Sequence, residues 1–141
     1  MPDISYVDSN TFILPVLGEK SRRAAGAARA LELMEGGGFV GYTSALTWDE
    51  VVWIVSRVLG KANGDQVGRK LLSYPGLRFL DVTSSTVARA QVISESLGLD
   101  PRDSIHCASA LLKGIGSVIS DDVDFEKVPE LKRITLESFN H

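Results

Sequence analysis

The sequence has few of the features that mark a secreted or membrane-bound protein. Its single cysteine, Cys107, allows neither an internal disulfide framework nor a zinc site built from several cysteines. No apolar run approaches the roughly 20 residues that a membrane-spanning helix needs. The first residues lack the basic stretch and the apolar block of a secretory signal. These absences predict a cytoplasmic protein that does not use a membrane as a partner.

The chain also lacks a surplus of positive charge. Its 15 lysines and arginines and 18 aspartates and glutamates give a net charge of −3, with a pI near 5.3. Proteins that hold a nucleic acid through its phosphates usually carry a basic surplus. Contact with a nucleic acid would therefore be local, with part of the positive charge supplied by bound metal. Basic side chains that could line the approach, or simply form solvated helix faces, are Lys20, Arg22, Arg23, Arg29, Lys61, Arg69 and Lys70.

Composition and segment order predict one α/β domain that spans residues 1–141. The chain is 44% hydrophobic and 23% charged, which is typical of a globular protein. Short β-prone runs are expected at residues 4–7, 39–42, 77–80, 117–119 and 133–135, and helices at 10–17, 21–35, 44–59, 65–73, 84–97 and 101–113. Strands that alternate with helices predict a three-layer α/β/α sandwich around a short parallel sheet.

Acidic residues follow two of the expected strands. Asp8 ends the first strand, and Asp121 and Asp122 follow the strand at 117–119. In open α/β sheets, ligands bind outside the carboxyl ends of the strands, so these residues are candidates for a site. Each also has a structural alternative, because Asp8 could cap the next helix and the aspartate pair could form a solvated turn.

Glu50 lies in a helix whose side chains are apolar nearly all round. On the helix expected at 44–59, it stacks with Leu46 and Ile54 at i−4 and i+4. A helix of this kind is expected to be buried, and a buried carboxylate requires a cation or a set of donors. Metal ligation and a hydrogen bond to the backbone both remain open.

Asp103 lies at the start of a helix in the segment Asp100-Pro101-Arg102-Asp103. Asp100 is expected to cap this helix, with Pro101 in its first turn and Asp103 in a capping-box-like position. Asp103 also shares a helix face with small side chains, which leave room for a substrate or an ion. Capping and ligand binding are therefore both open for this carboxylate.

Four segments in order resemble one family. They are Tyr6-Val7-Asp8-Ser9-Asn10, Thr47-Trp48-Asp49-Glu50-Val51, Asp103-Ser104-Ile105-His106-Cys107-Ala108 and Ser120-Asp121-Asp122-Val123-Asp124-Phe125. Together they resemble PIN-domain ribonucleases, and among these the VapC-type toxins of prokaryotic toxin–antitoxin pairs. The resemblance extends over essentially the whole chain and implies a PIN-like fold.

The resemblance implies a role for each acidic position. The catalytic and metal-binding positions of the family are matched by Asp8, Glu50, Asp103 and Asp122. Aligning on Phe125 selects Asp122 as the fourth ligand, but the adjacent Asp121 leaves open which of the two faces the metal. Polar residues expected around these ligands are Asn10, Ser120, Asp121 and Asp124. His106 matches a frequent family residue and is expected to be a half-buried structural histidine.

Carboxylate oxygens are hard ligands that suit Mg²⁺ or Mn²⁺ and not zinc. Because carboxylates held close together repel one another, some are expected to have raised pKa values without metal. The resemblance implies an endoribonuclease that cleaves RNA phosphodiesters with a metal-activated water, leaving a 5′ phosphate and a 3′ hydroxyl. It also implies the toxin of a type II toxin–antitoxin system, a homodimer silenced by a small antitoxin protein.

Two alternatives within the family stay open: a PIN-domain ribonuclease of RNA processing without an antitoxin, and a catalytically silent PIN-like binding module. Two other Mg²⁺-dependent classes lack their residue patterns here. A haloacid dehalogenase-type phosphatase needs an Asp-x-Asp pair after the first strand, where this chain has Asp8-Ser9-Asn10. A receiver domain needs two adjacent acidic residues there.

Overall fold

A five-stranded parallel sheet forms the centre of the computed structural model, which describes residues 1–141. The strands are β1 (Ile4–Val7), β2 (Val40–Ser44), β3 (Leu77–Leu80), β4 (Ser117–Ile119) and β5 (Lys132–Ile134). Their order across the sheet is β3-β2-β1-β4-β5, and every neighbouring pair is parallel. The predicted parallel sheet is therefore confirmed.

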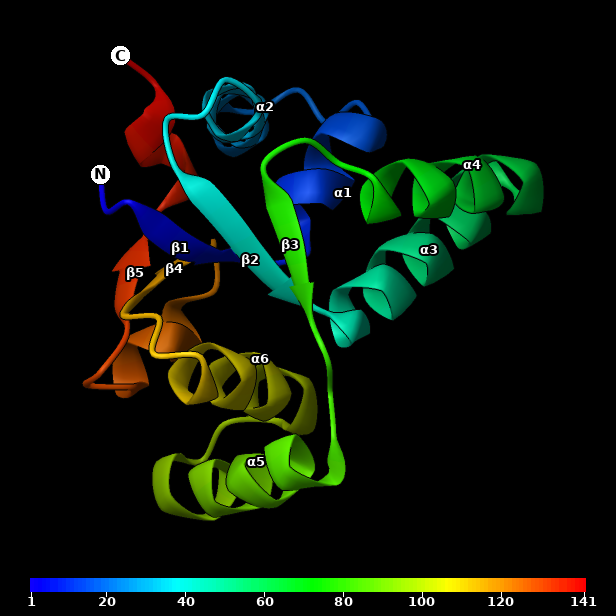
Figure 1. Cartoon of the computed structure of the whole chain (residues 1–141). Coiled ribbons are helices and arrows are strands. Elements are labelled where there is room, and N and C mark those ends of the chain that lie inside the picture. The colour runs from blue at the N-terminus through cyan, green and yellow to red at the C-terminus, as the bar shows by residue number, and fades with distance from the viewer.

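Helices cover both faces of this sheet. They are α1 (Asn10–Val16), α2 (Arg22–Glu35), α3 (Ala45–Leu59), α4 (Lys61–Leu72), α5 (Ser84–Leu97) and α6 (Pro101–Leu112), with short 3-10 helices η1 (Val123–Lys127) and η2 (Leu136–Phe139). Figure 1 shows α1 to α4 on one side of the sheet and α5 and α6 on the other. The arrangement is the predicted three-layer sandwich. None of the helices combines the length and the hydropathy required to cross a membrane.

The two faces of the sheet belong to two separate hydrophobic clusters. Val7 and Ile119 pack in a cluster of 16 buried residues with α1 to α4. Tyr6 and Val118 pack in a cluster of 12 buried residues with α5 and α6. Because successive side chains of a strand point to opposite faces, each central strand contributes to both clusters. Burial on both faces fixes the register of β1 and β4, and hence the positions of the residues that follow them.

Three helices begin at side-chain caps. Ser21 Oγ accepts a hydrogen bond from the backbone N–H of Ala24 at the start of α2, and Thr83 caps α5 in the same way. Asp100 caps α6 by accepting from the N–H of Asp103, with Pro101 in the first turn. These caps satisfy backbone donors that have no partner within the helix. The predicted start of α6 is confirmed.

The region of α3 and α4 differs from the prediction in two ways. Helix α4 begins at Lys61, four residues earlier than expected, because Gly60 adopts φ +92° and turns the chain sharply after α3. The expectation that α3 is buried all round is wrong. It buries Thr47, Val51 and Val55, whereas Trp53 is 55% exposed.

The sheet has one point where its winding reverses. From β1 the chain proceeds through β2 to β3 on one side, and β4 and β5 then extend the sheet on the other side of β1. Asp8 directly follows β1, and Ser120 directly follows β4. Crevices at such switch points are where open α/β sheets bind ligands. The residues after β1 and β4 therefore occupy the favoured place for a site.

Gly26 allows α2 to approach η2 closely, and we expect Gly26→Ala to destabilise the fold. A Cβ atom at residue 26 would overlap the backbone carbonyl of Leu136. We expect the free energy of unfolding to fall by about 1–3 kcal/mol, although alanine improves helix propensity by up to about 1 kcal/mol. Chemical denaturation measures the change.

Gly36, the C-cap of the same helix, provides the matched control. Its φ is −81°, and an added Cβ would have its nearest neighbour at 3.4 Å. We expect Gly36→Ala to change the stability by no more than about 0.5 kcal/mol. Equal stability of the two variants would show that α2 and η2 are not in close contact.

Candidate metal and active site

One cleft at the carboxyl edge of the sheet gathers the predicted acidic residues. It has a volume of about 340 Å³ and is lined by Asp8, Ser9, Asn10, Ile13, Asp49, Glu50, Trp53, Ile54, Arg102, Asp103 and Asp122. The four carboxylates predicted as ligands come from the end of β1, from α3, from α6 and from the loop after β4. They lie up to 114 residues apart in the chain (Asp8 to Asp122) and meet in this cleft.

Asp8 is held by two hydrogen bonds that it accepts. The backbone N–H of Ser9 donates to Oδ1 at 2.8 Å, and the Ser120 hydroxyl donates to Oδ2 at 2.7 Å. Ser9 is the N-cap residue of α1 but makes no side-chain cap, and Asp8 satisfies a backbone donor at the start of this helix while it also lines the cleft. Ser120 Oγ also accepts from the N–H of Asp122 at 3.0 Å. Ser120 thus ties Asp8 to the loop that carries Asp122.

Glu50 is oriented by a histidine rather than by the backbone. Its Oε1 lies 2.6 Å from Nε2 of His106. Because an ionised carboxylate only accepts, Nε2–H is the donor. The Glu50 side chain is 18% exposed, so it is partly open to the cleft.

His106 is fully buried, and the expectation of a half-buried histidine is wrong. Only 1% of the residue is exposed, and Nδ1 lies 2.6 Å from the hydroxyl of Tyr6. Burial opposes the charged imidazolium, but Tyr6, Glu50 and Asp8 outweigh it and hold the pKa of His106 well above its ordinary value. The ring connects β1, α3 and α6 and fixes Glu50 beside Asp8, whose Oδ1 lies 3.7 Å from Nε2.

Asp103 is the least satisfied of the four carboxylates. The residue is 9% exposed, and its Oδ2 is buried without a hydrogen-bond partner. Burial raises the pKa of Asp103 well above its ordinary value, and Asp122, Asp100 and Asp8 raise it further. The predicted repulsion among the carboxylates is therefore present at this residue. A buried carboxylate oxygen without a donor is suited to a cation.

The neighbours Asp121 and Asp122 point in different directions. Asp121 Oδ2 accepts from Arg23 Nη1 at 2.9 Å, and Asp121 does not line the cleft. Asp122 lines the cleft and accepts from the N–H of Asp124 through Oδ1 at 2.9 Å. Asp124 forms an ion pair of 3.3 Å with Lys127 outside the cleft. Of this acidic run, Asp122 lines the cleft, and Asp124 has a carboxylate oxygen close to those of Asp103 and Asp122.

The side-chain atoms that could bind a metal ion fall into two groups, and within each group these atoms lie within 4.8 Å of one another. One group consists of Asp8, Glu50 and His106, and the other of Asp103, Asp122 and Asp124. His106 Nε2 is engaged by Glu50, which leaves the carboxylate oxygens as the available donors. A set of oxygen donors fits Mg²⁺ or Mn²⁺ better than zinc.

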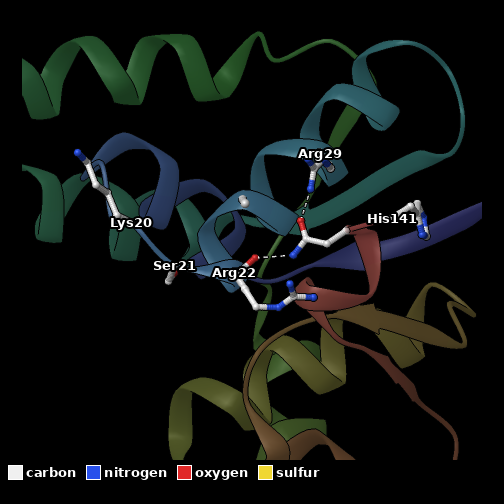
Figure 2. Close-up of a pocket in the computed structure, with 7 residues that line it drawn as sticks. Lys20, Ser21, Arg22, Arg29 and His141 are labelled. Carbon is white, nitrogen blue, oxygen red and sulfur yellow. Dashed lines mark hydrogen bonds between the residues drawn. The ribbon is translucent and has the colours of Figure 1, made fainter.

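The basic residues near α2 lie apart from the carboxylates. Lys20, Arg22 and Arg29 line another cavity of about 510 Å³ with Ser21, Ala25, Asn140 and His141 (Figure 2). The Asn140 amide donates to the backbone oxygen of Arg22 and accepts from Arg29. The cation that lines the acidic cleft is Arg102, at the start of α6. The set of basic residues predicted to line the approach therefore did not include Arg102, which is the basic residue that the cleft contains.

A doubly wound α/β sandwich with acidic side chains at its switch point defines the structural class. Within that class the PIN domain model matches residues 5–131, and the chain belongs to the PIN domain family. No curated protein matches the chain at a significant level.

Solved structures with the same fold include proteins of toxin–antitoxin systems. Mycobacterium tuberculosis VapC20, described as a toxin that cleaves the sarcin–ricin loop, aligns with a TM-score of 0.74 at 19% identity, over 89% of this chain and 95% of that chain. A toxin–antitoxin complex from Klebsiella pneumoniae aligns with a TM-score of 0.67 at 21% identity, over 91% of this chain and 95% of that chain. DNA-bound VapBC from Salmonella typhimurium aligns with a TM-score of 0.71 at 18% identity, over 96% of this chain and 99% of that chain. At these identities the similarity establishes the fold.

Asp103→Asn is expected to stabilise the metal-free protein at alkaline pH. The folded pKa of Asp103 lies above its ordinary value of 3.8, so the folded protein binds this proton more tightly than the unfolded chain. The free energy of unfolding therefore falls as the pH rises from about 4 through the folded pKa. Asparagine removes this loss, and calorimetry in EDTA should show a Tm that is higher by about 3 °C or more above that pKa.

Asp49→Asn serves as the control, because Asp49 lies at the exposed rim of the same cleft. Its Tm should follow the wild type at every pH. If Asp103→Asn also followed the wild type throughout, Asp103 would not be crowded by other carboxylates in the folded protein.

Proposed function

We propose that the chain is a metal-dependent endoribonuclease and the toxin of a type II toxin–antitoxin pair. The observation that carries the proposal is the convergence of Asp8, Glu50, Asp103 and Asp122 on one cleft of a PIN-domain protein. The buried, unpartnered Oδ2 of Asp103 supports it, because hydrogen bonds within the protein leave this oxygen unsatisfied. The similarity to VapC20 and to toxin–antitoxin complexes supports the assignment as a toxin.

In this proposal the four carboxylates hold Mg²⁺ or Mn²⁺. The bound ion would activate a water molecule for in-line attack and neutralise charge on the phosphate. Asn10 lies beside the ligands in the cleft, and Ser120 keeps Asp8 in place. Asp121 binds Arg23 outside the cleft, whereas Asp124 lies close enough to Asp103 and Asp122 to support the ion from the edge of the cleft.

The remaining residues position the substrate and the carboxylates. His106 holds Glu50 through Nε2–H, and Ser9 and Ser120 donate to the two oxygens of Asp8. These contacts restrict the rotamers of the ligands before metal arrives, which lowers the entropy lost on binding. Arg102 supplies a positive charge at the cleft for an RNA phosphate. The acidic net charge is compatible with RNA cleavage when contact is confined to this region.

The partners proposed are RNA, a second copy of the chain and a small antitoxin. The apolar early segment formed by Phe12, Ile13, Leu14, Val16 and Leu17 could supply an interface or belong to the core. Phe12, Ile13 and Leu14 are buried in the core of the monomer, whereas Val16 is 39% exposed. A ribonuclease without an antitoxin would share the cleft described above. A small upstream open reading frame that overlaps the gene would favour the toxin assignment.

Metal-dependent cleavage of a long structured RNA tests the proposal. We expect the wild type to cleave in Mn²⁺ or Mg²⁺ and to lose activity in EDTA. Asp8→Asn and Asp122→Asn should each lower kcat/KM by at least about 100-fold, because each removes a proposed ligand. Both ions should also raise the Tm of the wild type, and the gain should shrink in the two variants.

Asp121→Asn is the matched control for Asp122→Asn, since the two residues are adjacent and only Asp122 lines the cleft. Loss of the exposed bridge to Arg23 should cost no more than about 1 kcal/mol of stability and leave cleavage within about threefold. Equal cleavage by wild type and Asp8→Asn would refute the proposed nuclease, as would the absence of cleavage by the wild type in Mn²⁺.

A further inference from the structure

The acidic cleft has an exposed tryptophan in its wall. Trp53 is 55% exposed and lines the same cleft as the four carboxylates. Tryptophan is highly buried on average, so an exposed indole in a cleft calls for an explanation. The core does not provide one, because α3 already packs against it through Thr47, Val51 and Val55. The indole is therefore available for a ligand.

The residues one turn before and one turn after Trp53 on α3 are polar, and Ile13 and Ile54 are the other apolar residues that line the cleft. The neighbours of Trp53 at i−4, i−3, i+3 and i+4 are Asp49, Glu50, Ser56 and Arg57. Residues at these spacings flank a side chain on a helix. Interfaces between proteins have apolar centres, with charged residues depleted there. A cleft in which one aromatic ring and two isoleucines lie among carboxylates and Arg102 instead fits a ligand that is itself aromatic and charged.

Glu50, Trp53 and Arg57 follow one another along one face of α3. Trp53 follows Glu50 by three residues, which corresponds to a backbone rise of about 4.5 Å along the helix axis. The Arg57 guanidinium carbon lies 4.7 Å from the centroid of the Trp53 ring, and Arg57 forms no ion pair. The order along the helix is therefore a proposed metal ligand, then an aromatic ring, then a cation that stacks on that ring and has no carboxylate partner.

We propose that Trp53 is a stacking platform for an unpaired RNA base next to the cleaved phosphate, and that Arg57 contacts the adjoining backbone. Single-stranded RNA is bound by stacking of unpaired bases on aromatic side chains beside cations, largely without regard to sequence. The platform rests on the proposed nuclease function, because it positions RNA against the carboxylates. It adds a substrate contact outside the set of metal ligands.

Trp48 provides a matched control on the same helix. It is 41% exposed, but it lines a different cavity with Gly64, Gly68 and Leu72 of α4. Its neighbours at i+3 and i+4 are Val51 and Val52, and Asp65 and Arg69 of α4 also line its cavity, which contains none of the four proposed ligands. Trp48 and Trp53 are the two tryptophans of the chain. Replacing either by phenylalanine leaves the other as the sole indole reporter.

Tryptophan fluorescence tests stacking directly. In an Asp8→Asn background, which is expected to bind RNA without cutting it, the Trp48→Phe and Trp53→Phe proteins are titrated with an oligouridylate of about ten nucleotides. We expect saturable quenching of the Trp53 signal and no change in the Trp48 signal. Fluorescence anisotropy of labelled oligouridylate reports binding independently. Binding without quenching of Trp53, or equal quenching of both tryptophans, would overturn the platform.

Kinetics in the otherwise wild-type protein separate the platform from the metal site. Trp53→Ala should raise KM for RNA about 5- to 100-fold with little change in kcat, because stacking contributes to binding. Trp53→Phe should restore most of the loss, and Trp48→Phe should match the wild type. An unchanged KM in Trp53→Ala, while Asp8→Asn is inactive, would reject the platform and leave the nuclease proposal intact. Failure of the wild type to cleave RNA would reject both.

Size-exclusion chromatography addresses the other role that an exposed indole can have. Trp53→Ala should keep the oligomeric state of the wild type. Conversion to a smaller species with an unchanged KM would assign Trp53 to a subunit interface and overturn the platform.

Discussion

Mutual repulsion of carboxylates in a partly desolvated cleft is the constraint on which the rest of the site depends. The sheet brings Asp8 and Asp122 together at its switch point, and α3 and α6 add Glu50 and Asp103. Fixed donors offset part of this repulsion: Ser9 and Ser120 at Asp8, and His106 at Glu50. Asp103 has no such donor on Oδ2, and burial first, then the neighbouring carboxylates, raise its pKa.

The same contacts join the two halves of the core. His106 lies in α6 on one face of the sheet, and it bonds Tyr6 of β1 and Glu50 of α3. Ser120 joins the ends of β1 and β4 through Asp8. Asp8 and Glu50 are therefore anchored to elements that the fold already holds rigidly, and Ser120 ties the loop of Asp122 to Asp8. Rigid elements place catalytic groups more accurately than loops do, and this arrangement suits a site that must accept an ion in a defined geometry.

The sequence predicts what depends on local pattern and misses what depends on distant contacts. The strand positions and the edge occupied by Asp8 and Asp122 follow from apolar runs and from the geometry of parallel sheets. Glu50 lines the cleft, but the expected burial of its helix all round is wrong. The spacing of apolar residues does not show which of them pack against another element of the fold. The bonds of His106 join residues 100 and 56 positions away, and the Arg23 bridge to Asp121 joins residues 98 apart. No local signal indicates such pairings.

Anomalous diffraction from crystals soaked in Mn²⁺ tests most directly whether the carboxylate cluster binds metal. The predicted result is an anomalous peak in the cleft with oxygen ligands at about 2.1 Å from the set Asp8, Glu50, Asp103 and Asp122, and none from Asp121. A cleft without a peak at saturating Mn²⁺, or a peak coordinated by Asp121 in place of Asp122, would contradict it.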